Sequence, residues 1–220
     1  MEKNMRIRRE VTPFLSVTVI AWVLMASLFD MWFIFSCLGS IGIAYFLYFF
    51  RDPERTSPQD NNAVVAGADG IVSSINLVQE NKYLQTPCTR ISIFLSLFDV
   101  HVNRAPISGK SAFLGYFPGK HLFTFQEKSS EVNQHNKILI TGDKTRCLVC
   151  QIVGPVCRRV VYWPAHDKDV DITTGDRIGM MKFGSRLDMY LPADEVEVIV
   201  KPGDTVRAGE TIVAHIRESI

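Results

Sequence analysis

Residues 11–50 constrain this chain more than any other feature, because forty consecutive residues contain one charged side chain, Asp30, and no lysine or arginine. Two apolar runs, 11–29 and 31–50, fill this stretch. Each is close to the length of ~20 residues with which a helix crosses a hydrocarbon core of ~30 Å. Lipid offers no hydrogen-bond partner to an exposed peptide group, so a segment inside it must be helical. The sequence therefore predicts a transmembrane helical hairpin within residues 1–50.

The charges that flank this hairpin predict its orientation. Four basic residues precede the first run, and Arg51 and Arg55 follow the second. By the positive-inside rule both ends stay in the cytoplasm, which predicts an inner-membrane protein whose remaining chain faces the cytoplasm. Asp30 then lies at the far interface, where Trp32 is a suitable anchor. A single span and a re-entrant pair are alternatives. A secretory signal peptide ending near Ala26 is another, and the second apolar run argues against it.

The composition changes after residue 50. Residues 51–62 are polar and rich in turn-forming residues, which predicts a linker. Residues 51–220 carry 20 basic and 20 acidic side chains. We expect no nucleic-acid partner, because such binding draws much of its affinity from phosphate neutralisation by a basic surface. Residues 51–220 are enough to bury one sizeable core, and residues 63–220 are predicted to form the domain that contains it.

Short β-rich runs dominate residues 63–220. Ile91, Ile93 and Leu95 occupy alternate positions, and this period of two is typical of a strand. Further strands are predicted at residues 63–65, 71–77, 138–140, 147–153, 160–163, 189–191, 196–200 and 212–216. Only residues 125–137 have a helical pattern. The domain is therefore predicted to be mainly β, a β-sandwich or partly open barrel.

Two segments, 66–72 and 201–210, share Gly-Asp and Ala-Gly pairs or their reverse. They resemble the two halves of a biotinyl/lipoyl-type β-sandwich, where such pairs close tight turns. Carrier versions of that fold display a modifiable lysine between methionines at a hairpin tip. Met181-Lys182 is the nearest approach here, so a membrane-anchored module that binds or carries without catalysis is one functional hypothesis.

Four segments carry the chemistry. Gly184-Ser185 lies between two β-like runs, and an isolated pair of this kind is usually a turn. It is not a nucleophile elbow, because the second glycine of G-x-S-x-G is missing. The other segments are YFFRDPER at 48–55, ADG at 68–70 and FDVHVNRAP at 98–106. In this order and spacing, they make almost the whole chain resemble the phosphatidylserine decarboxylase proenzymes of the short bacterial and archaeal kind.

The resemblance implies a self-processing zymogen. Ser185 is expected to attack the Gly184 carbonyl and form an ester, and elimination and hydrolysis then convert Ser185 into a pyruvoyl group. The products are a β chain of residues 1–184 and an α chain of residues 185–220, held together as a heterodimer. The pyruvoyl group is the one cofactor implied. It forms a Schiff base with the serine headgroup and acts as an electron sink, so phosphatidylserine becomes phosphatidylethanolamine and CO₂.

The resemblance also points to His101 and Asp69 as catalytic residues. His101 can carry a proton near neutral pH, and the alternative is a structural histidine bonded to a backbone carbonyl. Asp69 matches the acidic member of the self-cleavage triad in long family members, and the alternative is a tight Asp-Gly turn. Those members have a second histidine where this chain has Arg104. Activation of Ser185 is therefore left to His101, to Asp69, or to a strained turn assisted by water.

Two further patterns assign no site. Residues 127–136 resemble a short-type motif that usually ends in Asn-Glu-Arg, but Gln134 and His135 replace its last two residues. Cys147 and Cys150 have the spacing of a redox or zinc pair, but no second pair completes a four-ligand set. Residues three apart on a strand also face opposite sides. We predict reduced thiols and no metal.

The partners expected are a phospholipid substrate and the membrane, with higher oligomers left open. The same chemistry on an archaeal-type ether lipid with a serine headgroup is a close alternative. The non-catalytic carrier module is the alternative of a different class. A carrier needs neither Gly184-Ser185 nor His101, and it is not split into two chains.

Overall fold

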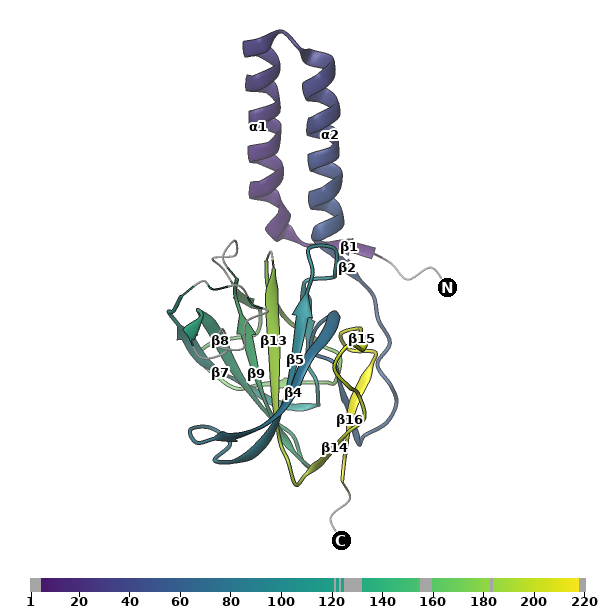
Figure 1. The fold of residues 1–220 in the computed structure, drawn as a ribbon, viewed down its shortest axis with the longest axis vertical. Helices are drawn as coiled ribbons and strands as arrows, with labels where there is room; N and C mark the ends of the chain where they lie inside the picture. Colours follow the sequence, from purple (N-terminus) through teal and green to yellow (C-terminus); the bar gives the residue numbers. More distant parts are fainter. Residues whose placement is uncertain are drawn as a thin grey trace. The chain divides into compact units, whose positions relative to one another are not determined.

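The computed structural model describes residues 5–120, 122, 124, 132–154, 160–182 and 184–217. The chain divides into two compact units, Met1–Glu54 and Arg55–Ile220. The first unit contains the two long helices, and the second is built from strands (Figure 1). The predicted mainly β fold with a preceding pair of apolar helices is confirmed.

The first unit is a helical pair closed by a short β-ladder. Its elements are β1 (Met5–Ile7), the 3₁₀ turn η1 (Arg9–Val11), α1 (Thr12–Phe29), α2 (Trp32–Phe49) and β2 (Arg51–Pro53). Asp30 ends α1 in the left-handed region, with φ of 52°, so the chain reverses there. β1 pairs antiparallel with β2, with Arg6 opposite Asp52. The two ends of the helical pair, and the basic residues near them, therefore lie together.

Small residues let α1 and α2 pack closely. A Cβ atom on Gly39 would lie 2.9 Å from Cγ of Trp22, and one on Gly42 would lie 3.2 Å from the methyl group of Thr18. Small residues at such contacts are how apolar helices pack closely where the hydrophobic effect does not drive them together.

The outer faces of the two helices are apolar. Val17, Phe33 and Ile41 are all largely exposed. α1 together with η1 is long and apolar enough to cross a membrane, and so is α2. Only 11% of the apolar 18-residue stretch in each of them is buried. The core helix of a soluble protein would bury these side chains, so their exposure favours a lipid environment.

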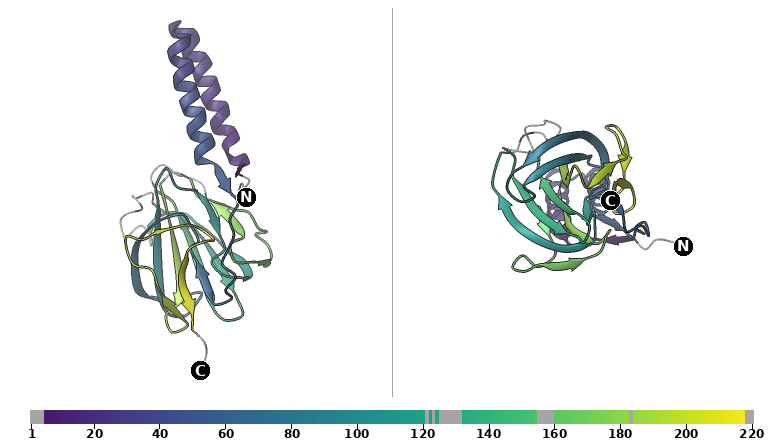
Figure 2. Two further views of the ribbon diagram at one scale, coloured as in Figure 1. Left: turned by 90° about the vertical axis from the view of Figure 1, so that its right-hand side faces the viewer. Right: turned by 90° about the horizontal axis from the view of Figure 1, so that it is seen from below.

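An eight-stranded antiparallel sheet forms the second unit, in the order β11-β7-β8-β9-β13-β5-β4-β15. Two three-stranded sheets, β10-β12-β6 and β14-β16-β3, complete it. The large sheet is strongly curved (Figure 2). The strands are β3 (Ala63–Val65), β4 (Gly70–Glu80), β5 (Thr86–Leu95), β6 (Val102–Arg104), β7 (Gly109–Phe117), β8 (His135–Thr141), β9 (Arg146–Ile152), β10 (Val161–Tyr162), β11 (Val170–Ile172), β12 (Arg177–Met180), β13 (Ser185–Pro192), β14 (Val196–Val198), β15 (Thr205–Val206) and β16 (Ile212–Ile216).

The predicted strands agree with most of these elements. β3 and β16 have the predicted bounds, whereas β7 was not expected because glycine, lysine and serine interrupt its apolar pattern. The helix predicted at 125–137 falls mostly outside the described residues. The prediction is wrong for residues 135–137, because these residues begin β8. Pairing of β8 with β7 and β9 overrides the local helical pattern there.

The large sheet has a hydrophobic cluster on each face. Cys147 belongs to the larger cluster and Cys150 to the smaller one, which confirms that these thiols face opposite sides. Burial raises the pKa of Cys150 to about 12, and burial raises that of Cys88 to about 11. Both stay protonated near neutral pH, and thiols are metal ligands only as thiolates. Within the described ranges, no cluster of histidine, cysteine and acidic residues suits a metal ion.

The two segments that share Gly-Asp and Ala-Gly pairs bind each other. The amide of Gly209 donates to the carbonyl of Ala66 at 2.8 Å, and the amide of Val72 donates to that of Asp204 at 2.9 Å. The likeness to a biotinyl/lipoyl-type sandwich stays a prediction. The pairing nevertheless ties the C-terminal segment to the start of β4.

Candidate active site

Ser185 is the first residue of β13, the strand that lies between β5 and β9 in the large sheet. It is fully buried and lies opposite Leu95. Gly184 precedes it with φ of +69°, a left-handed conformation that glycine adopts without cost. A Cβ atom at 184 would meet nothing within 4 Å, so backbone conformation, not space, favours glycine here. The Ser185 hydroxyl donates to the carbonyl of Lys182 at 3.4 Å, which closes the turn.

The Gly184 carbonyl, the group that Ser185 would attack, is held by distant residues. The hydroxyl of Thr124 donates to its oxygen at 3.3 Å. A Cβ atom on Gly154 would lie 2.3 Å from the same oxygen, so only glycine at 154 leaves room for this carbonyl. Thr124 is itself buried. The carbonyl is thus enclosed, with one hydroxyl donor aimed at its oxygen.

Asn133 ties together the segments that carry these two residues. Its side-chain amide donates to the carbonyls of Leu122 at 2.7 Å and Val153 at 2.9 Å, and its oxygen accepts from the Leu122 amide at 3.0 Å. Leu122 is two residues before Thr124, and Val153 is one before Gly154. Asn133 belongs to the short-type motif that the sequence left without a site residue.

A buried ion pair supports the same region from β13. Arg186 donates to the backbone carbonyl of Thr124 at 3.1 Å. Its Nε lies 2.9 Å from Oδ1 of Asp188, and both side chains are buried. A buried arginine needs such a partner, and the pair keeps the guanidinium in one place. The sequence does not indicate Thr124, Gly154 or this pair, because none of them carries a recognisable local signal. Asn133 lies in a family-like motif, but that motif departs from its usual ending at Gln134 and His135.

His101 is fully buried and precedes β6. Its Nδ1 lies 2.9 Å from the carbonyl oxygen of Asp99, which can only accept, so Nδ1 carries the proton in the neutral ring. The backbone carbonyl of His101 accepts from the amide of Met181 at 3.1 Å. His101 is therefore joined to the segment that leads into the Ser185 turn, and it also makes the backbone contact expected of a structural histidine.

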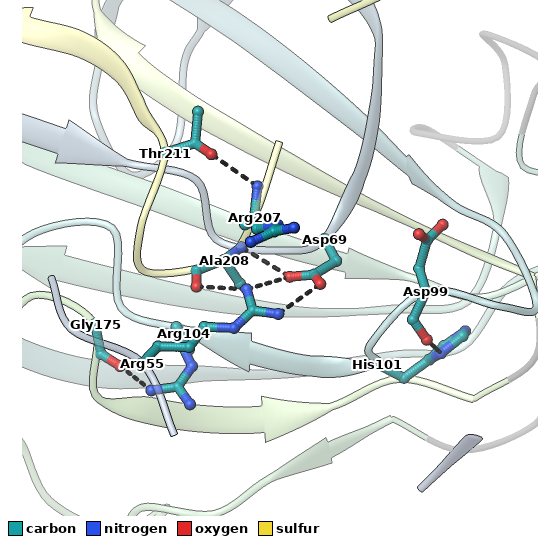
Figure 3. A network of polar contacts seen from close by, with 9 residues as sticks. All are labelled: Arg55, Asp69, Asp99, His101, Arg104, Gly175, Arg207, Ala208 and Thr211. Atoms are coloured by element: carbon teal, nitrogen blue, oxygen red, sulfur yellow. Dashed lines mark hydrogen bonds and ion pairs between the residues drawn. The ribbon is translucent and has the colours of Figure 1, made fainter. Parts of the chain in front are cut away.

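Asp69 has a different environment (Figure 3). Its two carboxylate oxygens accept from Arg55 at 2.5 and 2.6 Å, and the backbone amide of Ala208 donates to Oδ1 at 2.8 Å. Both charged side chains are largely buried. Among the described residues no hydrogen bond joins Asp69 to His101 or Ser185, so the structure does not bring the three into a relay.

The Asp-Gly turn expected as the alternative is not what surrounds Asp69 either. Gly70 has φ of +141° and begins β4. A Cβ atom there would lie 2.0 Å from the carbonyl oxygen of Phe94 on β5. Glycine is needed at 70 because two strands approach closely. Asp69, in turn, binds both Arg55 and the Ala208 amide, and so connects the start of the β domain to the C-terminal segment.

Arg104, which stands where long family members have their second histidine, binds a turn. Its Nη1 donates to the carbonyl of Gly175 at 2.8 Å, and its backbone amide donates to Gly67 at 2.9 Å. Arginine is not a base near neutral pH, so this position does not supply one.

His135 replaces the last residue of the short-type motif and is buried at the start of β8. Its ring stacks on Phe117 with centroids 5.1 Å apart, and its Nδ1 lies 2.7 Å from the Asn133 carbonyl oxygen. Burial lowers the pKa of His135. The side chain thus packs against the edge of the site as a neutral ring.

Known proteins match the chain over this whole region. A family model described as phosphatidylserine decarboxylase matches residues 43–214. A protein of Symbiobacterium thermophilum named phosphatidylserine decarboxylase proenzyme is 39% identical over 211 residues, or 96% of this chain and 95% of that protein. One of Carboxydothermus hydrogenoformans with the same name is 43% identical over 174 residues, or 79% of this chain and 80% of that protein.

The family match includes Gly184, Ser185 and the His101 segment. The chain is therefore an enzyme, a decarboxylase. It belongs to the phosphatidylserine decarboxylase family, which confirms the resemblance found in the sequence.

Proposed function

We propose that this enzyme converts phosphatidylserine into phosphatidylethanolamine and CO₂ with a pyruvoyl group that it makes by cleaving itself between Gly184 and Ser185. The observation that carries the proposal is the Gly184 carbonyl, enclosed beside a buried serine and approached by the Thr124 hydroxyl at 3.3 Å. The relatives named proenzymes support it, because that name implies processing.

The cleavage consumes no reagent other than water. Ser185 Oγ adds to the Gly184 carbonyl carbon, the C–N bond between the two residues breaks, and the hydroxyl proton passes to the nitrogen, which leaves an ester. Transfer of the Ser185 α-proton to water or to a neighbouring base then forms the Cα=Cβ bond, breaks the Cβ–Oγ bond and releases the Gly184 carboxylate. The dehydroalanine that is left takes up water and loses ammonia, which gives the pyruvoyl group.

Thr124 would stabilise the first of these steps. Negative charge develops on the Gly184 oxygen as Ser185 adds, and the Thr124 hydroxyl already points to that oxygen. A donor of this kind, in a site that excludes water, typically contributes ~10²–10³ to a rate. Asn133 acts through Thr124 and Gly154 by fixing their segments, and is a positioning residue.

The strand pairing favours two chains that stay associated after cleavage. β13 bonds to β5 on one side and β9 on the other, β15 pairs with β4, and β16 pairs with β3. An α chain of residues 185–220 would therefore keep its place through four strand pairings with the β chain of residues 1–184.

The pyruvoyl group supplies an electron-accepting carbonyl for decarboxylation. The fit is supported by the place of Ser185 at the start of β13, joined through its turn to the His101 segment. With Nδ1 protonated, the other ring nitrogen of His101 is the atom that takes up and returns a proton. Asp69 is not assigned a part, because Arg55 and Ala208 occupy its oxygens.

We also propose that residues 1–50 hold the enzyme in the inner membrane, that residues 51–62 are a linker, and that residues 63–220 are the catalytic domain on the cytoplasmic side. The exposed apolar faces of α1 and α2 support the membrane assignment. The β1–β2 ladder supports the orientation, because it gathers the basic residues at one end of the helical pair.

Intact mass spectrometry and a denaturing gel test the cleavage. Active protein should show a fragment that begins at position 185 with a blocked N-terminus, and Ser185→Ala should stay as one chain because alanine has no oxygen to attack with. A wild-type preparation that turns over phosphatidylserine as the intact 220-residue chain contradicts the proposal. Turnover of the serine ether lipid but not the ester lipid would favour the archaeal-type substrate.

A further inference from the structure

The turn before His101 presents large apolar side chains to solvent. Leu97 is 44% exposed and Phe98 is 67% exposed. The turn is held from within: Asp99 accepts from the Ser96 amide at 2.7 Å and donates its own amide to the Ser96 carbonyl at 3.2 Å. The Phe98 amide donates to the Ser96 hydroxyl at 3.3 Å. These bonds fix the conformation of the turn that carries the two exposed apolar side chains.

This apolar turn, residues 96–99, lies at the candidate site. Leu95, the residue before it, is opposite Ser185 in the sheet. Asp99, its last residue, accepts from the His101 ring. The exposed side chains thus lie on the short segment that leads from Leu95, the sheet partner of Ser185, to His101.

The same end of the β domain is the one joined to the helices. Arg55 is bound to Asp69 there, directly before β4, and Ile71 of β4 lies opposite Phe94 of β5. Ile71 is also 48% exposed. From Phe49, the last residue of α2, to Arg55 the chain spans at most ~20 Å, whatever angle the two units adopt.

We propose that Leu97 and Phe98 insert into the surface of a lipid bilayer and hold the mouth of the site against it. The short segment from Phe49 to Arg55 keeps this end of the β domain near the bilayer that the helices would occupy. Exposed apolar side chains on a rigid turn are suited to contact with the surface of such a bilayer. The proposal rests on the proposed function in one respect, that the substrate is a bilayer lipid. Lipid contact itself does not depend on it.

Leu77 provides a matched control. It is 72% exposed on the same strand pair, opposite Thr89, and six residues along β4 from Ile71. At ~3.3 Å per residue this places it ~20 Å from the proposed contact. If exposure and apolar character alone were enough for lipid contact, positions 77 and 98 would contact lipid equally.

Photo-crosslinking tests the contact in the full chain. A photoreactive phenylalanine analogue is placed at 98 or at 77, and the protein is reconstituted in phosphatidylglycerol–phosphatidylethanolamine vesicles. We expect phospholipid adducts at least tenfold more abundant from position 98 than from 77. Equal yields at the two positions, or adducts to another protein chain in place of lipid, overturn the proposal.

Kinetics test the consequence. Leu97→Ser/Phe98→Ser should still form the fragment that begins at 185 and should turn over water-soluble short-chain phosphatidylserine as the wild type does, but lose at least tenfold on vesicles. Leu77→Ser should change neither. An equal loss on both substrates shows that the turn acts through His101 and overturns docking. A wild type that lacks both the fragment and turnover refutes the proposed function, and the lipid adducts then still report on docking.

Discussion

The Ser185 turn and the Arg55–Asp69 contact lie at the same end of the β domain, and their polar groups are held very differently. At the turn, the hydroxyl of Thr124 is 3.3 Å from the Gly184 oxygen. At the contact, the carboxylate of Asp69 accepts from Arg55 at 2.5 and 2.6 Å. Short charge-assisted bonds occupy a group fully, whereas a longer single bond leaves it able to respond to a developing charge. Asp69, a residue of a family-like motif, thus stabilises the fold, whereas Thr124, which lies outside those motifs, contacts the carbonyl that would react.

Replacement of His101 should have the largest effect on turnover. We expect His101→Ala to form the fragment that begins at 185 and to lose ~10²–10⁴-fold in lipid decarboxylation, because a positioned acid–base group contributes about this much. Fragment formation is followed by mass spectrometry and turnover by CO₂ release. If the variant stays uncleaved, His101 activates Ser185. If it cleaves and turns over normally, the histidine is structural.

Removal of the Thr124 hydroxyl should slow cleavage without unfolding the domain. Thr124→Val is expected to slow fragment formation by ~10²–10³, because the Gly184 oxygen loses a donor, while Thr124→Ser keeps that donor and should cleave at close to the wild-type rate. The measurement is a time course of cleavage after synthesis. A valine variant that matures like wild type removes Thr124 from the mechanism.

Asp69 should show the opposite pattern, a loss of stability with little change in cleavage. Breaking one side of a buried ion pair costs roughly 3–5 kcal/mol, and Asp69→Asn leaves the buried guanidinium of Arg55 without its counter-charge. Thermal unfolding should shift downward, while the folded fraction still yields the fragment. If the Asp69→Asn variant is instead stable but uncleaved, the Asp69 carboxylate takes part in self-cleavage.

The smallest effect expected is a pH dependence of stability from His135. Its pKa is lowered in the folded protein because the ring is buried, so the unfolded chain binds a proton more readily. Stability should therefore fall as pH drops through the ordinary histidine pKa of ~6.5. Unfolding midpoints measured between pH 7.5 and 5.5 should fall less in His135→Gln than in wild type. Equal slopes would show that His135 does not titrate on unfolding.

Local features of the sequence were enough for much of the fold. The lack of charge in residues 11–50 predicted the helical pair, because only a helix satisfies its own backbone in lipid. The two-residue period predicted a mainly β domain, and β3 and β16 even to their bounds. β7 could not be predicted, because its neighbours in the sheet, not its own residues, make it a strand.

The candidate site divides in the same way. The pair Gly184-Ser185 was visible in the sequence because the attacking oxygen and the carbonyl it would attack belong to adjacent residues. Thr124 comes from 60 residues before that carbonyl, and only the pairing of the strands brings it there. The partner of Asp69 is 14 residues away, and its position follows from how the start of the β domain closes.

The sequence by itself determined the membrane-compatible helices, the mainly β domain and the family, since these depend on composition, on period and on motifs that need no knowledge of contacts. The tertiary structure alone decided which side chains surround the Gly184 carbonyl and that Asp69 pairs with Arg55. The physical reason is that hydrogen bonds act over ~3 Å, and strand register, which no short stretch of sequence specifies, selects the residues that come within this distance.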